Sequence, residues 1–210
     1  MPSELFLGDA AARLRASVVA IVVDSHGSGR GRGARRGDHG AGFAWGDGGG
    51  DLFVTSAHVV SARKAVVLTP DGRAVEGTVV GRDADRDLAL LHAPKARVPA
   101  VTCGDPYALR PGALVFAVGH PLGVRDAVSV GVFQAVRAVP LGFGMAERRP
   151  RRGRSPFIPW VQADVRLAPG NSGGPIADVE GNVIGVAAMI VSGLALAVPA
   201  PDLERLLSTS

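Results

Sequence analysis

Apolar residues are gathered in short runs along most of this chain, and each run is bounded by Gly, Pro, Asp or Ser. Residues 17–23, 114–119 and 183–191 are three such runs, consisting mainly of Val, Ala, Ile and Leu. β-Branched residues favour strands, and short apolar runs between turn residues are typical of a β-sandwich or β-barrel. The pattern therefore predicts an all-β protein.

Further runs lie on both sides of residues 93–112, a segment with four prolines that we interpret as a crossover. The expected strands cover residues 17–23, 41–46, 51–60, 65–69, 74–82 and 87–91 before it, and residues 114–119, 127–139, 160–164, 174–177, 183–191 and 194–198 after it. Short helices are expected over residues 3–16 and 201–207. In the first helix Ser3 is the expected N-cap, with Leu5, Ala12 and Ala16 on one face.

Composition limits how the core is built. Hydrophobic residues make up 47% of the chain but aromatic residues only 5%, so we expect a core of Val, Ala and Leu. The 29 glycines and 15 prolines fit many tight turns between strands. The single cysteine, Cys103, excludes an internal disulfide, and its small side chain is expected to be buried.

The net charge of +4 arises mainly from two arginine-rich segments, residues 24–40 and 142–159. Such glycine- and arginine-rich segments bury little apolar area, so we expect solvated surface loops. Contact with nucleic-acid phosphates is the alternative, but no aromatic residues are interleaved for base stacking, so nucleic acid is not the favoured partner.

No apolar run is long enough to span a membrane. Near the N-terminus the apolar stretch at residues 5–7 is too short for a signal peptide, and Glu4 and Asp9 replace the expected basic flank. We therefore expect a soluble chain without membrane contact, and a cytoplasmic one if the sequence is complete.

Residues 169–176 (Pro-Gly-Asn-Ser-Gly-Gly-Pro-Ile) place Ser172 among glycines, just before an apolar run. Glycines permit a tight loop in which backbone N–H groups converge on one point. Acyl transfer needs this combination of a hydroxyl nucleophile and oxyanion donors. A glycine-rich turn with an incidental serine is the alternative interpretation of this stretch alone.

Two segments upstream favour the first interpretation. Residues 54–60 end a β-prone run at His58, and Asp87 begins the apolar strand at residues 87–91. The chain order His, Asp, Ser is that of chymotrypsin-type enzymes. Asp83 and Asp85 compete for the acidic role. Asp87 is preferred because it directly precedes the strand, where a carboxylate can be buried against the histidine.

The amino-acid sequences of these three segments resemble those of the HtrA/Deg branch of the chymotrypsin-like serine proteases. The resemblance is to the protease domain, and this chain shows no PDZ domain after it. The matching motifs are Thr-Ser-Ala-His-Val-Val at residues 55–60, Asp-Leu-Ala-Leu-Leu at residues 87–91 and Gly-Asn-Ser-Gly-Gly-Pro at residues 170–175. The resemblance covers about residues 17–207, with further matches in residues 40–43, 111–123, 128–132 and 196–199.

The resemblance implies two six-stranded antiparallel β-barrels of the chymotrypsin/trypsin type with short terminal helices. The N-terminal helical segment would be residues 1–16, the first barrel residues 17–100, and the second barrel with the C-terminal helix residues 101–210. It also implies that the N-terminal segment supports a homotrimer through aromatic contacts, for which Phe6 is the candidate residue. The favoured alternative for Phe6 is a simple core or surface anchor. The segment at residues 142–159 corresponds to the family's ligand-sensing loop.

In this family pattern Ser172 is the nucleophile, His58 the general base and Asp87 the residue that orients the histidine. The oxyanion hole involves Gly170, Asn171 and Ser172, with the backbone N–H groups of Gly170 and Ser172 as donors. No metal or other cofactor is expected, since the histidines are scattered and Cys103 has no partner at ligand spacing.

The same layout places the expected substrate pocket between three segments. It consists of Arg166, Leu167, Ala168, Ala187, Ala188, Met189 and Leu196. Small apolar walls favour a small aliphatic residue on the acyl side of the scissile bond (P1). Arg166 leaves two alternatives: pointing inward it would attract an acidic P1 residue, and pointing outward it leaves the aliphatic preference intact.

The sequence thus predicts a serine endopeptidase that hydrolyses peptide bonds in exposed or unfolded polypeptides. A catalytically silent relative that binds peptides in the same cleft is the alternative.

Overall fold

The structure is a computed structural model that describes residues 3–23, 39–46, 49–140 and 157–207. The first-half elements are α1 (Ser3–Arg15), β1 (Val18–Val22), β2 (His39–Ala44), β3 (Leu52–Ser56), β4 (Lys64–Leu68), β5 (Ala74–Asp83) and β6 (Leu88–His92). The second-half elements are β7 (Leu114–Gly119), η1 (Pro121–Gly123), β8 (Ala127–Pro140), β9 (Phe157–Asp164), β10 (Pro175–Asp178), β11 (Val183–Val191), β12 (Leu194–Pro199), η2 (Ala200–Leu203) and α2 (Glu204–Leu207).

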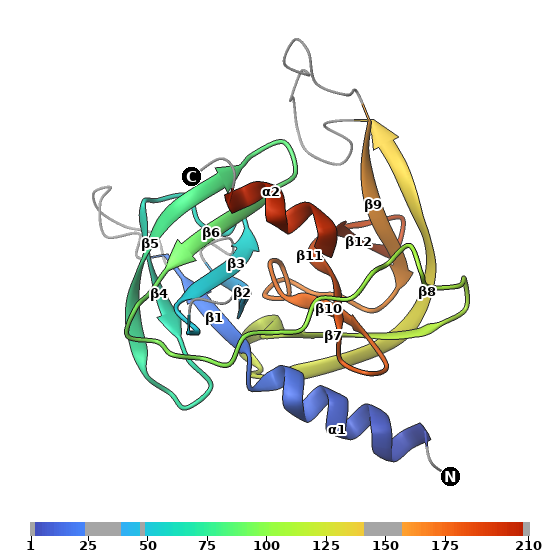
Figure 1. Cartoon of the computed structure of the whole chain (residues 1–210), viewed down its shortest axis with the longest axis horizontal. Coiled ribbons are helices and arrows are strands. Elements are labelled where there is room, and N and C mark those ends of the chain that lie inside the picture. The colour runs from blue at the N-terminus through green and yellow to red at the C-terminus, as the bar shows by residue number, and fades with distance from the viewer. Residues whose placement is uncertain (1–2, 24–38, 47–48, 141–156, 208–210) are drawn as a thin grey trace.

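The strands form two closed antiparallel barrels of six strands each, with the orders β1-β2-β3-β6-β5-β4 and β10-β11-β12-β9-β8-β7. Figure 1 shows the barrels beside each other, with α1 below and α2 across the top of the junction. Closure removes exposed sheet edges, which open sheets must otherwise protect. The predicted fold of two six-stranded chymotrypsin-type barrels is confirmed.

Each barrel encloses its own core of small and β-branched side chains, as the composition predicts. Alternation along the strands directs Val19 and Ile21 of β1 into the first barrel, whereas Val18 faces away from it. In the second barrel Val115 and Ala117 point inward, while Phe116 and Val118 face outward.

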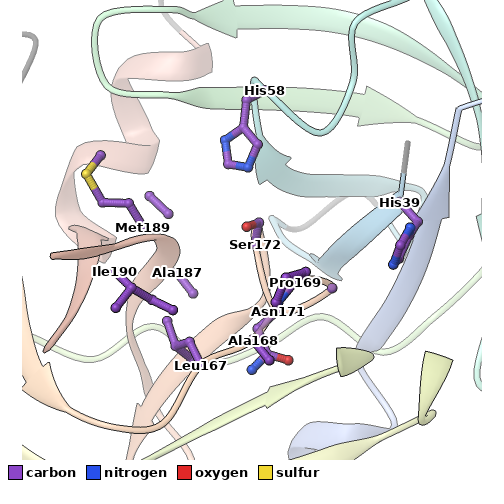
Figure 2. A pocket seen from close by; sticks show the side chains of 12 residues that line it. His39, His58, Leu167, Ala168, Pro169, Asn171, Ser172, Ala187, Met189 and Ile190 are labelled. Atoms are coloured by element: carbon purple, nitrogen blue, oxygen red, sulfur yellow. The ribbon is translucent and has the colours of Figure 1, made fainter. Parts of the chain in front are cut away.

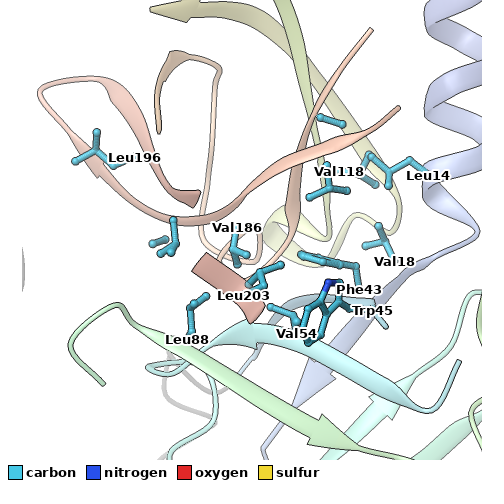
Figure 3. Close-up of a cluster of buried hydrophobic side chains, with 14 of the residues drawn as sticks. Leu14, Val18, Phe43, Trp45, Val54, Leu88, Val118, Val186, Leu196 and Leu203 are labelled. Atoms are coloured by element: carbon cyan, nitrogen blue, oxygen red, sulfur yellow. The ribbon is translucent and has the colours of Figure 1, made fainter. Parts of the chain in front are cut away.

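A third core joins the two barrels, and most of the large buried side chains lie in it (Figure 3). Phe43, Val54 and Leu88 come from the first barrel, and Phe116 and Trp160 from the second. Leu14 of α1 and Leu203 of η2 close this core from the two ends of the chain. The barrels are therefore packed together by buried apolar surface, which fixes the candidate site residues of the two barrels relative to one another.

Helix α1 buries a different face from the predicted one. Ala10, Ala11 and Leu14 are buried, whereas Ala12 and Ala16 are exposed. The reason is tertiary: α1 contacts β7 and the turn near Glu180, whose carbonyl accepts a hydrogen bond from Arg13 Nη2 at 3.3 Å. Ser3 lies inside the helix rather than at its cap.

Several predictions fall on parts of the chain outside this description. The side chain of Phe6, the candidate trimer contact, is not among the described side chains. Most of the two arginine-rich segments also lies outside the described residues. None of the helices in the described part of the chain has the length and apolar character needed to cross a bilayer.

The prediction that Cys103 is buried is wrong, because the residue is exposed. It lies in the crossover between the barrels and makes a single bridge to Val183 instead of entering a strand of either barrel. A small side chain therefore did not mean an inward-facing position.

Candidate active site

The ends of two neighbouring strands bring His58 and Asp87 together. Strands β3 and β6 are antiparallel, with Ser56 opposite Leu88, so the turn after β3 meets the residue that precedes β6. The Ala57 N–H donates to the Asp87 carbonyl at 2.9 Å, which continues the ladder by one step. The predicted strand at residues 51–60 is too long: β3 ends at Ser56, and residues 57–59 form the turn that carries His58.

The Asp87 carboxylate holds His58 through both of its oxygens. Oδ2 lies 2.6 Å from His58 Nδ1, and Oδ1 accepts the His58 backbone N–H at 2.9 Å. Asp87 is buried and has a left-handed φ of 57°, a conformation that aspartate tolerates better than most residues. Its hydrogen bond raises the pKa of His58; burial of the ring opposes this shift, and the negative charge of Asp87 adds to it.

The two competing aspartates are placed differently. Asp83 is only partly buried and pairs with Arg86 at 3.1 Å, and Asp85 is also partly exposed. Arg86 in turn pairs with Asp202 of η2 at 3.1 Å, which fastens this turn to the C-terminal segment. Of the three carboxylates, Asp87 is the one that reaches His58.

Ser172 lies on the serine loop, which we define as residues 168–173. The Ser172 carbonyl accepts the Ala41 N–H of β2 at 2.8 Å, and the Gly173 N–H donates to the Ala187 carbonyl at 2.7 Å. Gly173 has a φ of 83°, and a Cβ there would lie 2.2 Å from Thr55 Oγ1 and 2.3 Å from the Ala41 carbonyl. A glycine is therefore required next to the serine because the loop is pressed against the first barrel.

A second contact joins the barrels at the same place. Ser56, two residues before His58, donates its hydroxyl to the Ala187 carbonyl at 3.2 Å, and Ser56 is fully buried. Ala187 belongs to β11 and faces the same cavity as Ser172. The carbonyl of Ala187 in the pocket wall therefore accepts hydrogen bonds both from Ser56, next to the histidine turn, and from Gly173 of the serine loop.

The serine loop presents unused backbone donors. Within the described residues, the N–H groups of Gly170 and Ser172 donate no hydrogen bond, whereas the Asn171 N–H between them donates to the Ala168 carbonyl at 3.0 Å. These two unused donors are the ones that the sequence predicted for an oxyanion hole. Asn171 is buried, and its side-chain Oδ1 has no hydrogen-bond partner among the described residues.

A cavity of about 270 Å³ lies in front of Ser172 and His58 (Figure 2). Its walls are formed by the serine loop, β11 and the first residue of β2. The lining residues are His39, His58, Leu167, Ala168, Pro169, Gly170, Asn171, Ser172, Ala187, Ala188, Met189 and Ile190. No hydrogen bond joins Ser172 to His58 among the described residues, and the hydrogen bond of the His58 ring is the one to Asp87.

Five of the seven predicted pocket residues line this cavity, namely Leu167, Ala168, Ala187, Ala188 and Met189. Arg166 does not: it is exposed, and it follows the buried Val165 with the alternation of an extended chain. Leu196 does not either, because it lines a separate cavity with Val139 and Gln162. Of the two orientations considered for the Arg166 side chain, the structure therefore has the one that points away from the cavity.

Sequence reasoning missed two histidines near the site. His39, the first residue of β2, is exposed and lines the cavity on the side of Ser172 opposite Ile190 (Figure 2). His120 is buried beneath the serine loop. Neither lies in one of the three motifs, but His120 directly follows an apolar strand, a position that could have drawn attention to it. Among the described residues, no group of three His, Cys, Asp or Glu is placed to hold a metal ion.

Comparison with known proteins agrees with this geometry. The model of the trypsin-like peptidase domain matches residues 40–186. A putative serine protease HhoB of Synechocystis is 35% identical over 150 residues, which are 70% of this chain and 34% of the relative. A probable periplasmic serine endoprotease DegP-like of Halomonas elongata is 34% identical over 155 residues, 70% of this chain and 30% of the relative.

Among solved structures, the HtrA-type protease AlgW with a decapeptide aligns over 97% of this chain and 67% of its own, with a TM-score of 0.76 and 25% identity. The chain spans about a third of the length of the two curated relatives. The family model extends over parts of both barrels and includes His58, Asp87 and Ser172. This chain belongs to the trypsin-like peptidase family, among relatives of the HtrA/Deg type.

Proposed function

We propose that this protein is a serine endopeptidase that cleaves exposed or unfolded polypeptides through an acyl-enzyme. Ser172 is the nucleophile, His58 the general base and acid, and Asp87 the residue that orients the imidazole. The observation that carries the proposal is the 2.6 Å contact between Asp87 Oδ2 and His58 Nδ1, at the edge of a cavity that Ser172 also lines.

In the first step His58 must be neutral. The Asp87 carboxylate fixes the ring proton on Nδ1, which leaves Nε2 as an acceptor. As the Ser172 Oγ attacks the peptide carbonyl carbon, Nε2 takes the hydroxyl proton and a tetrahedral oxyanion forms. His58 then gives that proton to the amine nitrogen, so the C–N bond breaks and the acyl-serine ester remains.

The second step repeats this chemistry with water. His58 takes a proton from water as it attacks the ester, and it returns the proton to Ser172 Oγ when the C–O bond breaks. In both steps the oxyanion would be held by the N–H groups of Gly170 and Ser172, which are free in the structure's described part. Loss of one such donor costs about 3 kcal/mol of transition-state stabilisation in comparable sites.

The P1 preference follows from the cavity walls. Leu167, Ala188 and Met189 are apolar, and Arg166 lies outside. A small or medium aliphatic side chain would bury its surface there, whereas a charged one would lose hydration without a partner. A peptide library varied at P1 tests this: Val, Ala or Leu should be cleaved best, and preference for Asp or Glu would contradict it.

Covalent labelling tests the nucleophile. A fluorophosphonate probe should label the wild-type protein once, and the Ser172→Ala variant should not be labelled. Ser129→Ala in β8 is the matched control and should be labelled like the wild type. Binding of unfolded casein by the wild type, without labelling or cleavage, would instead support the peptide-binding alternative.

Cleavage of unfolded casein tests the substrate class. Protein sized by gel filtration should cleave casein, and Ser172→Ala should abolish cleavage. Folded substrates should be cut far more slowly, because an extended segment is needed to enter the cleft.

A further inference from the structure

The turn after β7 holds the serine loop from below. This β7–β8 turn (residues 119–126) includes η1 and connects two neighbouring strands of the second barrel. The His120 N–H donates to the Gly170 carbonyl at 3.2 Å, and the Leu122 N–H donates to the Pro169 carbonyl at 3.0 Å. Two consecutive carbonyl groups of the serine loop are therefore fixed by one turn.

These bonds determine where the Gly170 N–H points. In a trans peptide unit the C=O and the following N–H point in opposite directions. A bond from Leu122 to the Pro169 carbonyl therefore directs the Gly170 N–H away from the turn. Gly170 has a φ of 105°, and a Cβ there would lie 2.3 Å from the His120 carbonyl, so the two backbones are in direct contact.

The contact continues one residue further along the loop. A Cβ at Gly119 would lie 2.6 Å from Asn171 Oδ1, so this buried amide rests directly on the turn. Any displacement of the turn would therefore be transmitted to Gly170 and Asn171 together.

The imidazole of His120 closes the turn from inside. Its side chain is only 7% exposed, and Nδ1 accepts the backbone N–H of Asp126 at 3.1 Å. Because Nδ1 is an acceptor, the neutral ring carries its proton on Nε2. Nε2 is buried and has no hydrogen-bond partner among the described residues. The proposed hydrolysis does not use this ring.

Few charged groups surround it in the described structure. On the turn itself, Asp126 Oδ1 lies 3.8 Å from Nδ1, and Arg125 is the adjacent cation. From α1, Arg15 approaches Asp126 Oδ2 to 3.9 Å, and from β1 the neighbour is the Val19 backbone. Burial lowers the pKa of His120; Asp126 and the Val19 backbone oppose this shift, and Arg125 adds to it.

We propose that neutral His120 is a positioning residue for the serine loop: it holds the turn that orients the Gly170 N–H, and its protonation loosens both. This inference rests on the proposed function, since it assigns the Gly170 N–H a role in hydrolysis. His120 thereby gives the site a second requirement for a neutral imidazole, separate from that of His58.

Hydrogen-bond chemistry gives the mechanism. A protonated imidazole is a donor at both nitrogens, so Nδ1–H would face the Asp126 N–H, and this hydrogen bond is lost. The new N–H would turn toward Asp126 Oδ1. Asp126 has a left-handed φ of 58° at the end of the turn, so its movement would shift the residues that hold the serine loop.

Hydrogen exchange followed by mass spectrometry tests this without relying on catalysis. In the Ser172→Ala background, which prevents self-cleavage, the peptides covering residues 119–126 and 166–174 are compared at pH 7.5 and pH 5, corrected for intrinsic exchange. We expect protection of both segments to fall severalfold at pH 5, because protonation of His120 removes its hydrogen bond with the Asp126 N–H. Unchanged protection would overturn the proposal, whether or not the protein is a protease.

His120→Asn is the decisive variant, because Asn Oδ1 can accept the Asp126 N–H but does not titrate. It should keep the loop protected at both pH values. His92→Asn is the matched control, since His92 is partly exposed on β6 and pairs with Asp51 away from the loop; it should behave like the wild type. The same loss of protection in His120→Asn would contradict the proposal.

Asp126→Asn provides a second variant that retains the backbone donor. Without the carboxylate the His120 cation loses its compensating charge, so the pH at which the loop loosens should fall. A rise in that pH would contradict the proposal. In the active protein, kcat/KM should fall with decreasing pH more steeply than the titration of a single group allows. In His120→Asn the slope should be that of a single titrating group.

Discussion

The two barrels contribute to the site in different ways. The first barrel supplies side chains, His58 and Asp87, from the ends of two paired strands. The second supplies Ser172 and backbone N–H groups on a loop that is held by the β7–β8 turn and by Ala41. Strand pairing fixes the proposed acid–base pair, whereas the proposed oxyanion donors depend on contacts between loops. Under the proposed function, the second barrel is therefore where activity can be adjusted.

The same contrast holds for His58 and His120. His58 is half exposed and contacts a carboxylate, which raises its pKa, whereas His120 is enclosed and accepts a backbone N–H, and burial lowers its pKa. The first is suited to move a proton and the second to remain uncharged.

In the first barrel, removing the charge of Asp87 should cause the largest loss of activity. Asp87→Asn keeps the size of the side chain but no longer fixes the His58 tautomer, and we expect kcat to fall by about 10⁴-fold. Asp85→Asn in the same turn is the control and should stay within about threefold of the wild type. Steady-state kinetics on one peptide substrate measures kcat for both variants. An equal loss of kcat in Asp87→Asn and Asp85→Asn would contradict the role assigned to Asp87.

On the second-barrel side, Gly173→Ala should lower both stability and activity. The new Cβ would meet Thr55 and the Ala41 carbonyl, so the loop must move away from the first barrel. We expect a loss of about 3 kcal/mol in the free energy of unfolding, from overpacking and a left-handed backbone together.

Gly193→Ala separates the two causes. Gly193 has nearly the same φ, 85°, but nothing lies within 4 Å of its Cβ position. The Gly193→Ala variant should lose only the part of the unfolding free energy that comes from the left-handed backbone, about 1 kcal/mol, and it should keep its activity. Urea denaturation and peptide cleavage are the measurements, and similar values for both variants would show that the contact between barrels is unimportant.

The pH dependence sharpens the difference between the histidines. In His120→Asn, which keeps His58 but removes the second imidazole of this comparison, kcat/KM should fall about tenfold per pH unit below a midpoint that lies above 6.5. Because the pKa of His58 is raised, its contribution to folding is complete below pH 6.5 and is lost as the pH rises through the folded-state value. A midpoint below 6.5 would contradict the assigned Asp87 contact.

The smallest effect is expected at Arg166. Its side chain is exposed and outside the cavity, so Arg166→Ala should leave the P1 preference unchanged and kcat/KM within about twofold. A selective loss of activity on acidic P1 peptides would show that the side chain turns inward during binding.

Much of the fold follows from the sequence because its cause is local. Short Val- and Ala-rich runs between glycines and prolines specify strands, and twelve expected strands correspond to β1–β12. His58, Asp87 and Ser172 could be proposed because each lies in a distinctive motif. Their meeting could not be derived from spacing alone, since it depends on β3–β6 pairing and on the contact between barrels.

Tertiary contacts explain what the sequence could not predict. The buried face of α1 is chosen by β7, so Ala10 and Leu14 are buried instead of Ala12. Leu196 faces a different cavity because β12 alternates its side chains between the barrel core and its outer face. His120 lies outside the three motifs of His58, Asp87 and Ser172, and only the fold shows that it lies beneath Gly170.

The hydrogen bonds from Ala41 to Ser172 and from Ser56 to Ala187 have a consequence for biosynthesis. The partners are more than a hundred residues apart, so these bonds can form only after both halves have been made and docked. Under the proposed function, a nascent or half-folded chain is therefore inactive, and activity begins only when the two barrels have docked.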